Sequence, residues 1–321
     1  MSYADQVFIQ NIRDILDHGV SDEGLPVRPR WEDGTPAHTI SLFGVVNRYD
    51  LSREFPLLTL RRTYWRSAWD EISWIWQKKS NNIRDLHSHV WDQWADEKGS
   101  IGKAYGYQYG VKYRVGDSSN APMVQNLRDL FGSGSVLTLA DGAGDVQEQG
   151  KGYHAVLASG KIWMDQVDEV IYNLNYNRAN RRMIATAWNK ADSADMALEP
   201  CAYSMTFNVK GNKLNAILNQ RSQDMIVANA WNACQYSMIL LAMASAYGYQ
   251  PGELVHVIAD CHIYDRHIPL AKEIIANKSY PVPKLWVDPS VKSFYDFQRD
   301  SFRLEGEYQF STFDQKIPVA I

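Results

Sequence analysis

Several features that would define a function are scarce in this sequence. Its 321 residues include only three cysteines, Cys201, Cys234 and Cys261, with no paired spacing. This excludes a disulfide framework and predicts reduced thiols in the cytoplasm, or in the host cytoplasm if the protein is phage-encoded. Acidic residues (37) outnumber Lys and Arg (33), and the net charge of -4 gives no general attraction to nucleic acid or an anionic membrane. Any anion site must therefore be local.

Long hydrophobic runs and metal-binding patterns are also missing. The longest apolar run, SMILLAMASAYGY at 237–249, is too short for a membrane span and contains Ser and Gly. The N-terminal residues MSYADQVFIQNIRDILDHGV carry spaced apolar positions with acidic residues between them, which indicates an amphipathic helix and not a signal peptide. His262 and His267 are five apart and lack the flanking acid pattern of a metalloprotease zinc site. We expect no membrane segment, no bound metal and no need for nucleic acid.

The residues that are present favour an α+β fold. Apolar residues make up 45% of the sequence, enough to bury a large core. Helical spacing or strand-like patterns predict helices over 1–20, 61–80, 163–177, 225–247 and 268–279, strands over 40–51, 181–188 and 254–264, and a hairpin over 203–220. Helices and strands are mixed without a regular repeat. We expect one domain, 1–321, with an elaboration at about 114–160.

Cys201 follows a proline at the head of a predicted strand, in LEPCAYSMTF at 198–207. If the hairpin turns at Gly211 and Asn212, Cys201 lies across from Arg221. A neighbouring guanidinium favours the thiolate, which is the reactive form. A free cysteine is more often buried and structural. The sequence pattern around Cys201 leaves open whether it is a reactive thiolate or a buried structural residue.

Polar residues follow the second strand of the hairpin directly. Arg221 and Ser222 can bind a phosphate through charge-assisted hydrogen bonds, helped by the N–H groups that begin the next helix. Alternatively, Ser222 or Asp224 serves only as an N-cap of that helix.

The helix predicted over 225–247 is apolar except for one stripe, Asn229, Asn232, Gln235 and Tyr236. Buried amides need partners. An asparagine offers both a donor and an acceptor, which matches the carbonyl and N–H of uracil, whereas cytosine presents the reverse edge. Alternatively, the stripe lies on a dimer seam or holds waters.

Short blocks along the sequence together resemble the signature blocks of the folate-dependent thymidylate synthase family. They are IWQ (75–77), VWDQWADE (90–97), RRMIATAWN (181–189), EPC (199–201), NQRSQD (219–224), AWN (230–232), ADCHIYDRH (259–267) and PVAI (318–321). The resemblance implies a homodimeric α+β protein whose sheet forms the dimer interface. It also implies transfer of a one-carbon unit from 5,10-methylenetetrahydrofolate, as cosubstrate, to carbon 5 of dUMP, with Cys201 as the nucleophile.

The resemblance assigns further roles residue by residue. Residues for the nucleotide phosphate are Arg221 and Ser222, an arginine of the 21–39 loop that is Arg28 or Arg30, with Arg28 preferred, and Arg181 and Arg182 from the second subunit. Residues for the nucleoside are Asn232 at the pyrimidine edge and the pair His262 and Tyr264 at the 3′-hydroxyl. Residues for proton movement are Glu71 and Tyr105. Residues for the folate are Asp224, Trp91 and, in the closing tail, Ile321.

Some positions depart from the family pattern. Ala202 follows the nucleophile where the family usually has His, and Ala259 replaces a usual Gly. Ala228, Ala230 and Trp231 stand where the family most often shows Gly-x-Pro-Phe-Asn. These changes leave open whether the methylene intermediate takes a hydride, giving dTMP and dihydrofolate, or water, giving 5-hydroxymethyl-dUMP as in phage-type deoxyuridylate hydroxymethylases. We favour dTMP. A further alternative is an inactive relative that binds nucleotide or RNA.

Overall fold

The computed structural model describes residues 1–140, 142 and 144–321, and it divides into two compact units. The first unit comprises Met1–Ile72, Cys201–Tyr203 and Asn212–Ile321, and the second comprises Ser73–Pro200 and Ser204–Gly211. Helices and mixed sheets occur in the molecule, which confirms the predicted α+β class. Within the described residues no helix is long and apolar enough to cross a membrane. The single domain stays a prediction.

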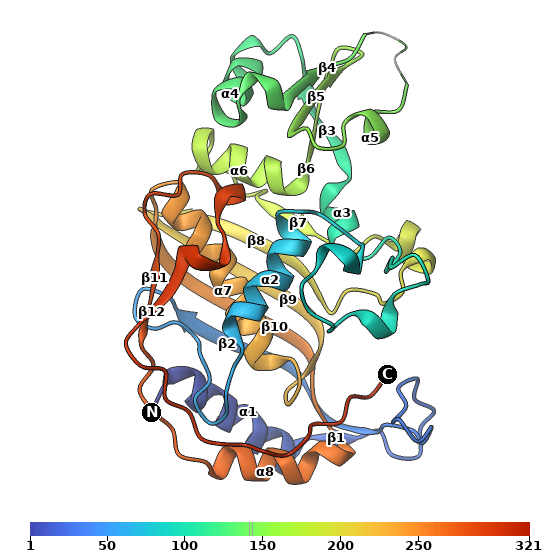
Figure 1. Cartoon of the computed structure of the whole chain (residues 1–321), viewed down its shortest axis with the longest axis vertical. Helices are drawn as coiled ribbons and strands as arrows, with labels where there is room; N and C mark the ends of the chain where they lie inside the picture. The colour runs from blue at the N-terminus through green and yellow to red at the C-terminus, as the bar shows by residue number, and fades with distance from the viewer. Residues whose placement is uncertain (141, 143) are drawn as a thin grey trace. The chain divides into compact units, whose positions relative to one another are not determined.

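The first unit is built on a sheet of order β1-β2-β10-β9 (Figure 1). Strand β10 pairs antiparallel with β2 and parallel with β9, so the sheet is mixed. The elements of this unit are α1 (Tyr3–His18), β1 (Val20–Ser21), β2 (Thr39–Asp50), α2 (Trp65–Trp76, which ends in the second unit), β9 (Lys213–Asp224), α7 (Asn229–Ala246), β10 (Gln250–Tyr264), η5 (Asp265–His267), α8 (Ile268–Ala276), β11 (Lys284–Val287), η6 (Phe294–Asp296), η7 (Arg299–Ser301) and β12 (Phe302–Glu305).

Helix α7 covers one face of β9 and β10 (Figure 1). The helix is apolar nearly all round and almost wholly buried, as expected of a helix inside a core. Alternate residues of both strands are buried, including Leu218 and Gln220 in β9 and His256 and Ile258 in β10. Gln220 and His256 are the polar members of these buried rows, and they need partners inside the core.

Helices α1 and α8 lie side by side in the same unit (Figure 1). Ser2 caps α1 by accepting from the Asp5 N–H at 3.0 Å. The buried Asp5 carboxylate accepts from the Thr59 N–H at 2.7 Å, so α1 is tied to the segment before α2. Asp5 thus serves folding, and the helix itself agrees with the amphipathic helix predicted there.

The predicted hairpin turn has the expected position. Strand β8 (Ala202–Lys210) ends just before Gly211 and Asn212, and β9 begins just after them. Gly211 has φ of 59°, a left-handed conformation that glycine adopts without a steric penalty. The helix predicted to begin at about Met225 begins four residues later in the structure. Residues 225–228 form a turn and α7 begins at Asn229.

The second unit contains the predicted elaboration as a small sheet of order β3-β6-β5-β4. Leu127, Ile162 and Met164 belong to its own buried cluster. Asp141 and Ala143 lie outside the described residues. The elements are η1 (Ile83–Asp85), η2 (Asp92–Trp94), α3 (Gly106–Gly110), β3 (Lys112–Asp117), α4 (Ala121–Phe131), η3 (Ser133–Ser135), β4 (Val136–Thr138), α5 (Val146–Gln149), β5 (Ala155–Ala158), β6 (Lys161–Asp165), α6 (Gln166–Tyr176), β7 (Ile184–Thr186), η4 (Lys190–Asp195) and most of β8. Strand β7 is shorter than the strand predicted over 181–188.

Candidate active site

Cys201 and Arg221 are neighbours, as the hairpin register predicted. The Arg221 N–H donates to the Cys201 carbonyl at 2.9 Å, and Arg221 Nη2 lies 3.7 Å from Cys201 Sγ. None of the three cysteines, all of which the structure describes, is in a disulfide, and Cys201 is partly exposed. Burial raises the pKa of Cys261 to about 12 and also raises the pKa of Cys234. Cys201 is therefore the thiol suited to nucleophilic chemistry.

The ends of β9 and β10 bring the predicted phosphate and ribose residues to one edge of the sheet. In the parallel register Ser222 pairs with Asp260 and Asp224 pairs with His262. Asp224 Oδ1 accepts from the N–H groups of Ile226 and Val227, at 2.8 and 3.0 Å. The capping alternative is thus partly correct, because Asp224 caps the turn over 225–228. The N-cap of α7 itself is Ala228, which makes no side-chain cap.

His262 and Tyr264 form a compact pair on β10. Their rings meet edge to face at 5.0 Å. His262 Nδ1 lies 2.8 Å from Asp260 Oδ1, while its Nε2 is buried without a hydrogen-bond partner in the described part of the protein. Burial, with the nearby charge of Asp224, raises the pKa of Tyr264 to about 12. The Tyr264 hydroxyl thus keeps its proton, and the pair offers two groups to a ligand hydroxyl.

The C-terminal residue is held by the 21–39 loop. The Arg30 N–H donates to the Ile321 carbonyl at 2.7 Å, and the Ile321 N–H donates to the Arg30 carbonyl at 2.9 Å. The main chain of Arg30 thus contacts the tail. The positive charge of Arg28 counteracts the rise in the pKa of Tyr264. This effect favours Arg28 as the arginine nearer the ribose residues.

Glu71 lies in α2, is buried, and accepts hydrogen bonds from α7. The Trp231 indole N–H donates to Glu71 Oε2 at 2.5 Å, and Gln235 Nε2 donates to the same oxygen at 2.9 Å. Asn232 Nδ2 donates to Gln235 Oε1 at 2.9 Å. Asn232 and Gln235 thus find partners inside the protein, whereas the sequence had left a dimer seam or waters open.

Two residues of this group, Trp231 and Gln235, were not among the predicted site residues. Both gave a signal in the sequence. Trp231 departs from the family pattern, and Gln235 belongs to the polar stripe of the helix. Spacings of three and four residues bring Trp231, Asn232 and Gln235 together on one face of α7. Their shared partner Glu71 could not be deduced, because it lies 160 residues or more away in the sequence.

The second unit holds the other predicted residues. Trp91 and Tyr105 are buried and meet edge to face at 5.0 Å. Tyr105 has φ of 44°, which is uncommon for a residue other than glycine and is typically found where the surroundings enforce it. Arg181 and Arg182 are exposed. The structure thus brings Trp91 and Tyr105 together and leaves both arginines accessible.

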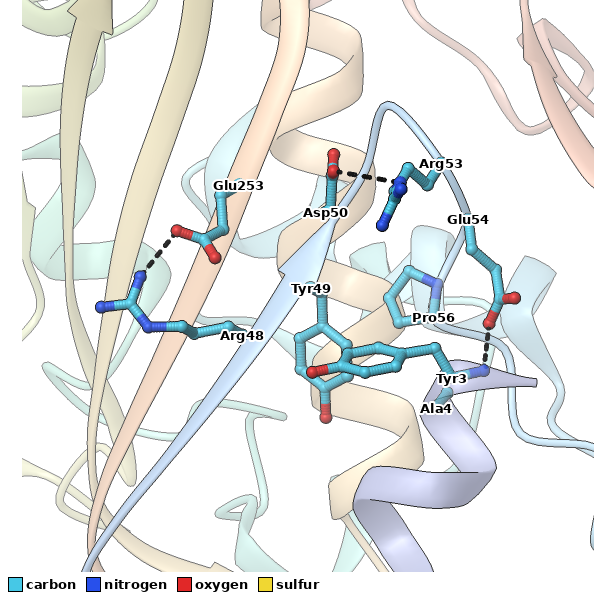
Figure 2. Close-up of a pocket in the computed structure, with 9 residues that line it drawn as sticks. All are labelled: Tyr3, Ala4, Arg48, Tyr49, Asp50, Arg53, Glu54, Pro56 and Glu253. Carbon is cyan, nitrogen blue, oxygen red and sulfur yellow. Dashed lines mark hydrogen bonds and ion pairs between the residues drawn. The ribbon is translucent and has the colours of Figure 1, made fainter. Parts of the chain in front are cut away.

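A pocket of about 440 Å³ in the first unit contains none of the predicted residues (Figure 2). Its charged groups already have partners. Arg48 lies 2.7 Å from Glu253 and Arg53 lies 3.8 Å from Asp50, while the Tyr3 N–H donates to Glu54 at 2.6 Å (Figure 2). We therefore do not regard this pocket as the active site. In the described residues no group of three or more His, Cys, Asp or Glu side chains could hold a metal.

The fold and the site together define the class of protein. It is an α+β protein with an accessible cysteine beside an arginine at a sheet edge.

Comparison with known proteins identifies the family. The thymidylate synthase family model matches residues 6–321. Thymidylate synthase of Bacillus licheniformis and thymidylate synthase 1 of Bacillus subtilis strain 168 are each 37% identical over 308 residues, with 95% of both chains covered. The solved structure of thermostable thymidylate synthase A from Bacillus subtilis matches with a TM-score of 0.79, 35% identity and 99% coverage of both chains. The protein belongs to the thymidylate synthase family.

Proposed function

We propose that this protein is a thymidylate synthase-type methyltransferase that converts dUMP to dTMP. In the balanced reaction a methyl group replaces the hydrogen on carbon 5, and 5,10-methylenetetrahydrofolate supplies both the carbon and the hydride and leaves as dihydrofolate. The observation that carries the proposal is the partly exposed Cys201 thiol beside the Arg221 guanidinium, in a chain of this family. The reduced cysteines fit action in the cytoplasm.

Cys201 acts as the nucleophile in this proposal. Its Sγ adds to carbon 6 of the uracil, and the electron pair of the ring double bond moves to carbon 5, which then forms the new bond to the one-carbon unit. Arg221 Nη2, at 3.7 Å, favours the thiolate before addition. Loss of the proton from carbon 5 then breaks the bond between the methylene carbon and the folate nitrogen and releases tetrahydrofolate. Hydride transfer from tetrahydrofolate to the methylene carbon gives dihydrofolate, expels the Cys201 thiolate and restores the ring double bond.

In this proposal, protein side chains bind the phosphate, the ribose and the base of the nucleotide. Arg221, Ser222 and Arg28 bind the phosphate, and Arg181 and Arg182 reach it from a second subunit. The buried Nε2 of His262, which has no partner in the described protein, fits the 3′-hydroxyl together with the Tyr264 hydroxyl. Asn232 reads the pyrimidine edge.

The folate cosubstrate is bound by Asp224, by the Trp91 ring and by the tail that ends at Ile321. An aromatic pair such as Trp91 and Tyr105 suits a flat aromatic ligand. Glu71 and Tyr105 move protons, and the closed tail excludes water during transfer. Exclusion of water favours hydride over hydroxide at the methylene carbon, and so favours dTMP over 5-hydroxymethyl-dUMP.

A homodimer completes the proposal. Large apolar residues on the strands of the first unit are exposed, among them Phe43 at 92% and Val46 at 53% in β2, and Ile217 at 42% in β9. Exposed apolar residues gathered on one sheet are typical of an interface. A mixture of inactive Arg181→Glu and inactive Cys201→Ala subunits is expected to regain part of the activity. Absence of activity in verified mixed dimers would argue against shared sites.

The deciding experiment follows both products in one reaction. The protein is incubated with dUMP and 5,10-methylenetetrahydrofolate, the nucleotide is identified by mass spectrometry, and dihydrofolate is followed by absorbance. A methylated nucleotide with equimolar dihydrofolate is expected. A hydroxymethylated nucleotide without dihydrofolate would overturn the proposed product while retaining Cys201 chemistry, and unchanged dUMP would overturn the enzymatic function.

A further inference from the structure

The hydrogen bonds around Glu71 extend beyond α7 into the sheet of the same unit. Gln220 Nε2 lies 3.3 Å from Asn232 Oδ1, and Gln223 Nε2 lies 3.4 Å from the same oxygen. His256 Nε2 lies 2.8 Å from Gln220 Oε1. We call the five connected residues His256, Gln220, Asn232, Gln235 and Glu71 the amide network.

The amide network has a single direction. Gln220 donates to Asn232, Asn232 donates to Gln235, and Gln235 donates to Glu71, so each amide N–H points toward the carboxylate. Glu71 Oε2 also accepts from the indole N–H of Trp231, a group that can only donate, so this oxygen acts as an acceptor and fixes the direction at this end. Hydrogen bonds aligned in this way polarise and strengthen one another in a buried site.

The hydrogen bond at the His256 end of the amide network runs in the same donor-to-acceptor direction. Because the Gln220 Oε1 atom can only accept, His256 Nε2 carries the hydrogen. Burial lowers the pKa of His256 to about 3, so the ring is neutral and has one N–H. Its Nδ1 is buried without a partner in the part of the protein described, in keeping with a nitrogen that bears no hydrogen.

Reversal of the Asn232 amide would conflict with both neighbours. Its NH₂ group would then face the donors of Gln220 and Gln223, and its oxygen would face the acceptor oxygen of Gln235. Gln235 cannot relieve the conflict by reversing as well, because its own oxygen would then face Glu71 Oε2. Buried polar groups left unpaired in this way cost about 1–3 kcal/mol each.

The direction of the Asn232 amide decides which pyrimidine it can pair with. In the observed direction Nδ2 has a second hydrogen for a carbonyl, and Oδ1 accepts, which suits the O4 and N3–H of uracil. In the reversed direction the pattern suits the amino group and N3 of cytosine.

We propose that Gln235 is a specificity-determining positioning residue, which transmits the acceptor character of Glu71 to Asn232 and so makes the site select uracil over cytosine. This inference rests on the proposed role of Asn232 in base reading. It assigns Gln235 a function that does not require contact with the nucleotide.

The test compares two substitutions at Gln235, with dUMP and dCMP binding measured by calorimetry and dUMP turnover measured in parallel. Gln235→Met keeps the length of the side chain and removes both hydrogen bonds. The preference for dUMP over dCMP is expected to fall by about tenfold, the effect of one lost buried hydrogen bond. Gln235→Glu keeps an acceptor for Asn232 Nδ2 but puts a second carboxyl group beside Glu71. It is expected to keep the preference and to lower turnover.

Asn229→Leu provides the matched control. Asn229 is another buried amide of α7, and its Nδ2 has no hydrogen-bond partner in the described protein. Its removal is expected to leave the dUMP preference unchanged. A fall in preference equal to that of Gln235→Met would assign the effect to loss of any buried amide and overturn the inference.

The outcomes separate the inference from the proposed function. If the unmodified protein binds dUMP in preference to dCMP and Gln235→Met retains the full preference, the inference is wrong and the proposed function stands. Equal loss of preference in Gln235→Glu and Gln235→Met also contradicts the inference. If the unmodified protein does not bind dUMP, the proposed function is wrong, and the inference that rests on it is wrong with it.

Discussion

Two buried polar groups of this protein, one in each unit, invite comparison. The amide network of the first unit consists of neutral groups that end on one carboxylate. In the second unit a charge cluster is formed by Lys79, Lys112, His154, Asp165 and Asp168. Lys79 Nζ lies 2.6 Å from Asp165 and 3.1 Å from Asp168, and His154 Nδ1 lies 2.9 Å from Asp168. Both groups satisfy buried polar atoms, yet they constrain the protein in different ways.

The charge cluster balances charges and joins elements. Burial alone would raise the pKa of Asp168, but Lys79 and His154 hold it below the usual value. Burial and the neighbouring Asp168 raise the pKa of Asp165 to about 6. Asp165 also caps α6 by accepting from the N–H groups of Val167 and Asp168. Ion pairs attract from many directions, whereas a series of amides has a definite donor-to-acceptor direction. The ion pairs of the charge cluster therefore suit stabilisation of the fold, whereas the directed amides of the amide network suit recognition of a base.

The largest effect is expected outside both groups, at the nucleophile. Cys201→Ala should reduce turnover by more than about 10⁴-fold, because the covalent route is lost. Nucleotide affinity should be retained, since neither polar group is disturbed. Steady-state kinetics and dUMP calorimetry measure the two effects, with Cys261→Ala as the control for a buried thiol. Undiminished turnover in Cys201→Ala would rule out the covalent mechanism.

Lys79→Met breaks the charge cluster and should destabilise the fold by about 3–5 kcal/mol, because two buried carboxylates lose their main counter-charge. Urea unfolding followed by tryptophan fluorescence measures the change. Lys161→Met is the control. Lys161 pairs with Asp117 at the surface, where screening by water leaves little stabilisation to lose. Equal changes in the free energy of unfolding for Lys79→Met and Lys161→Met would mean that the charge cluster does not stabilise the fold.

Asn232→Asp alters the amide network at the position proposed to read the base. A protonated Asp presents a donor hydroxyl and an acceptor in an order that a cytosine ring can use, so the preference should shift from dUMP toward dCMP. The ratio of kcat/KM for the two nucleotides measures the shift. An unchanged ratio would mean that the base is read elsewhere.

The effect expected at His256 is a change in the pH dependence of stability. Its pKa of about 3 in the folded state lies below the ordinary value of 6.5. Between these values the unfolded state binds a proton that the folded state does not, so stability falls as the pH decreases, by up to about 1.4 kcal/mol per pH unit. His256→Gln keeps an N–H for Gln220 and cannot titrate. Its unfolding free energy should therefore depend less on pH from 6.5 to 4 than that of the unmodified protein, and an identical slope would contradict this assignment.

The sequence allowed local geometry to be predicted well where neighbours in sequence are neighbours in space. The pairing of Cys201 with Arg221 followed from a turn at Gly211 and Asn212, since strand periodicity determines which residues face each other. The start of α7 was predicted wrongly. Apolar spacing continues through Met225 and Ile226, but Asp224 Oδ1 accepts from the N–H groups of Ile226 and Val227 and stabilises a turn there instead.

The α+β class, the family blocks and the candidate residues follow from the order of the amino acids, because they depend on residue type, order and short spacing. Tertiary structure alone decided that Trp231 and Gln235 bond to Glu71, and that His256 bonds to Gln220. These partners come from separate helices and strands. Their distances depend on how α2, α7 and the sheet of the first unit pack. The direction of the amide network is likewise a property of the packed core, because an amide side chain has no preferred direction until its partners are in place.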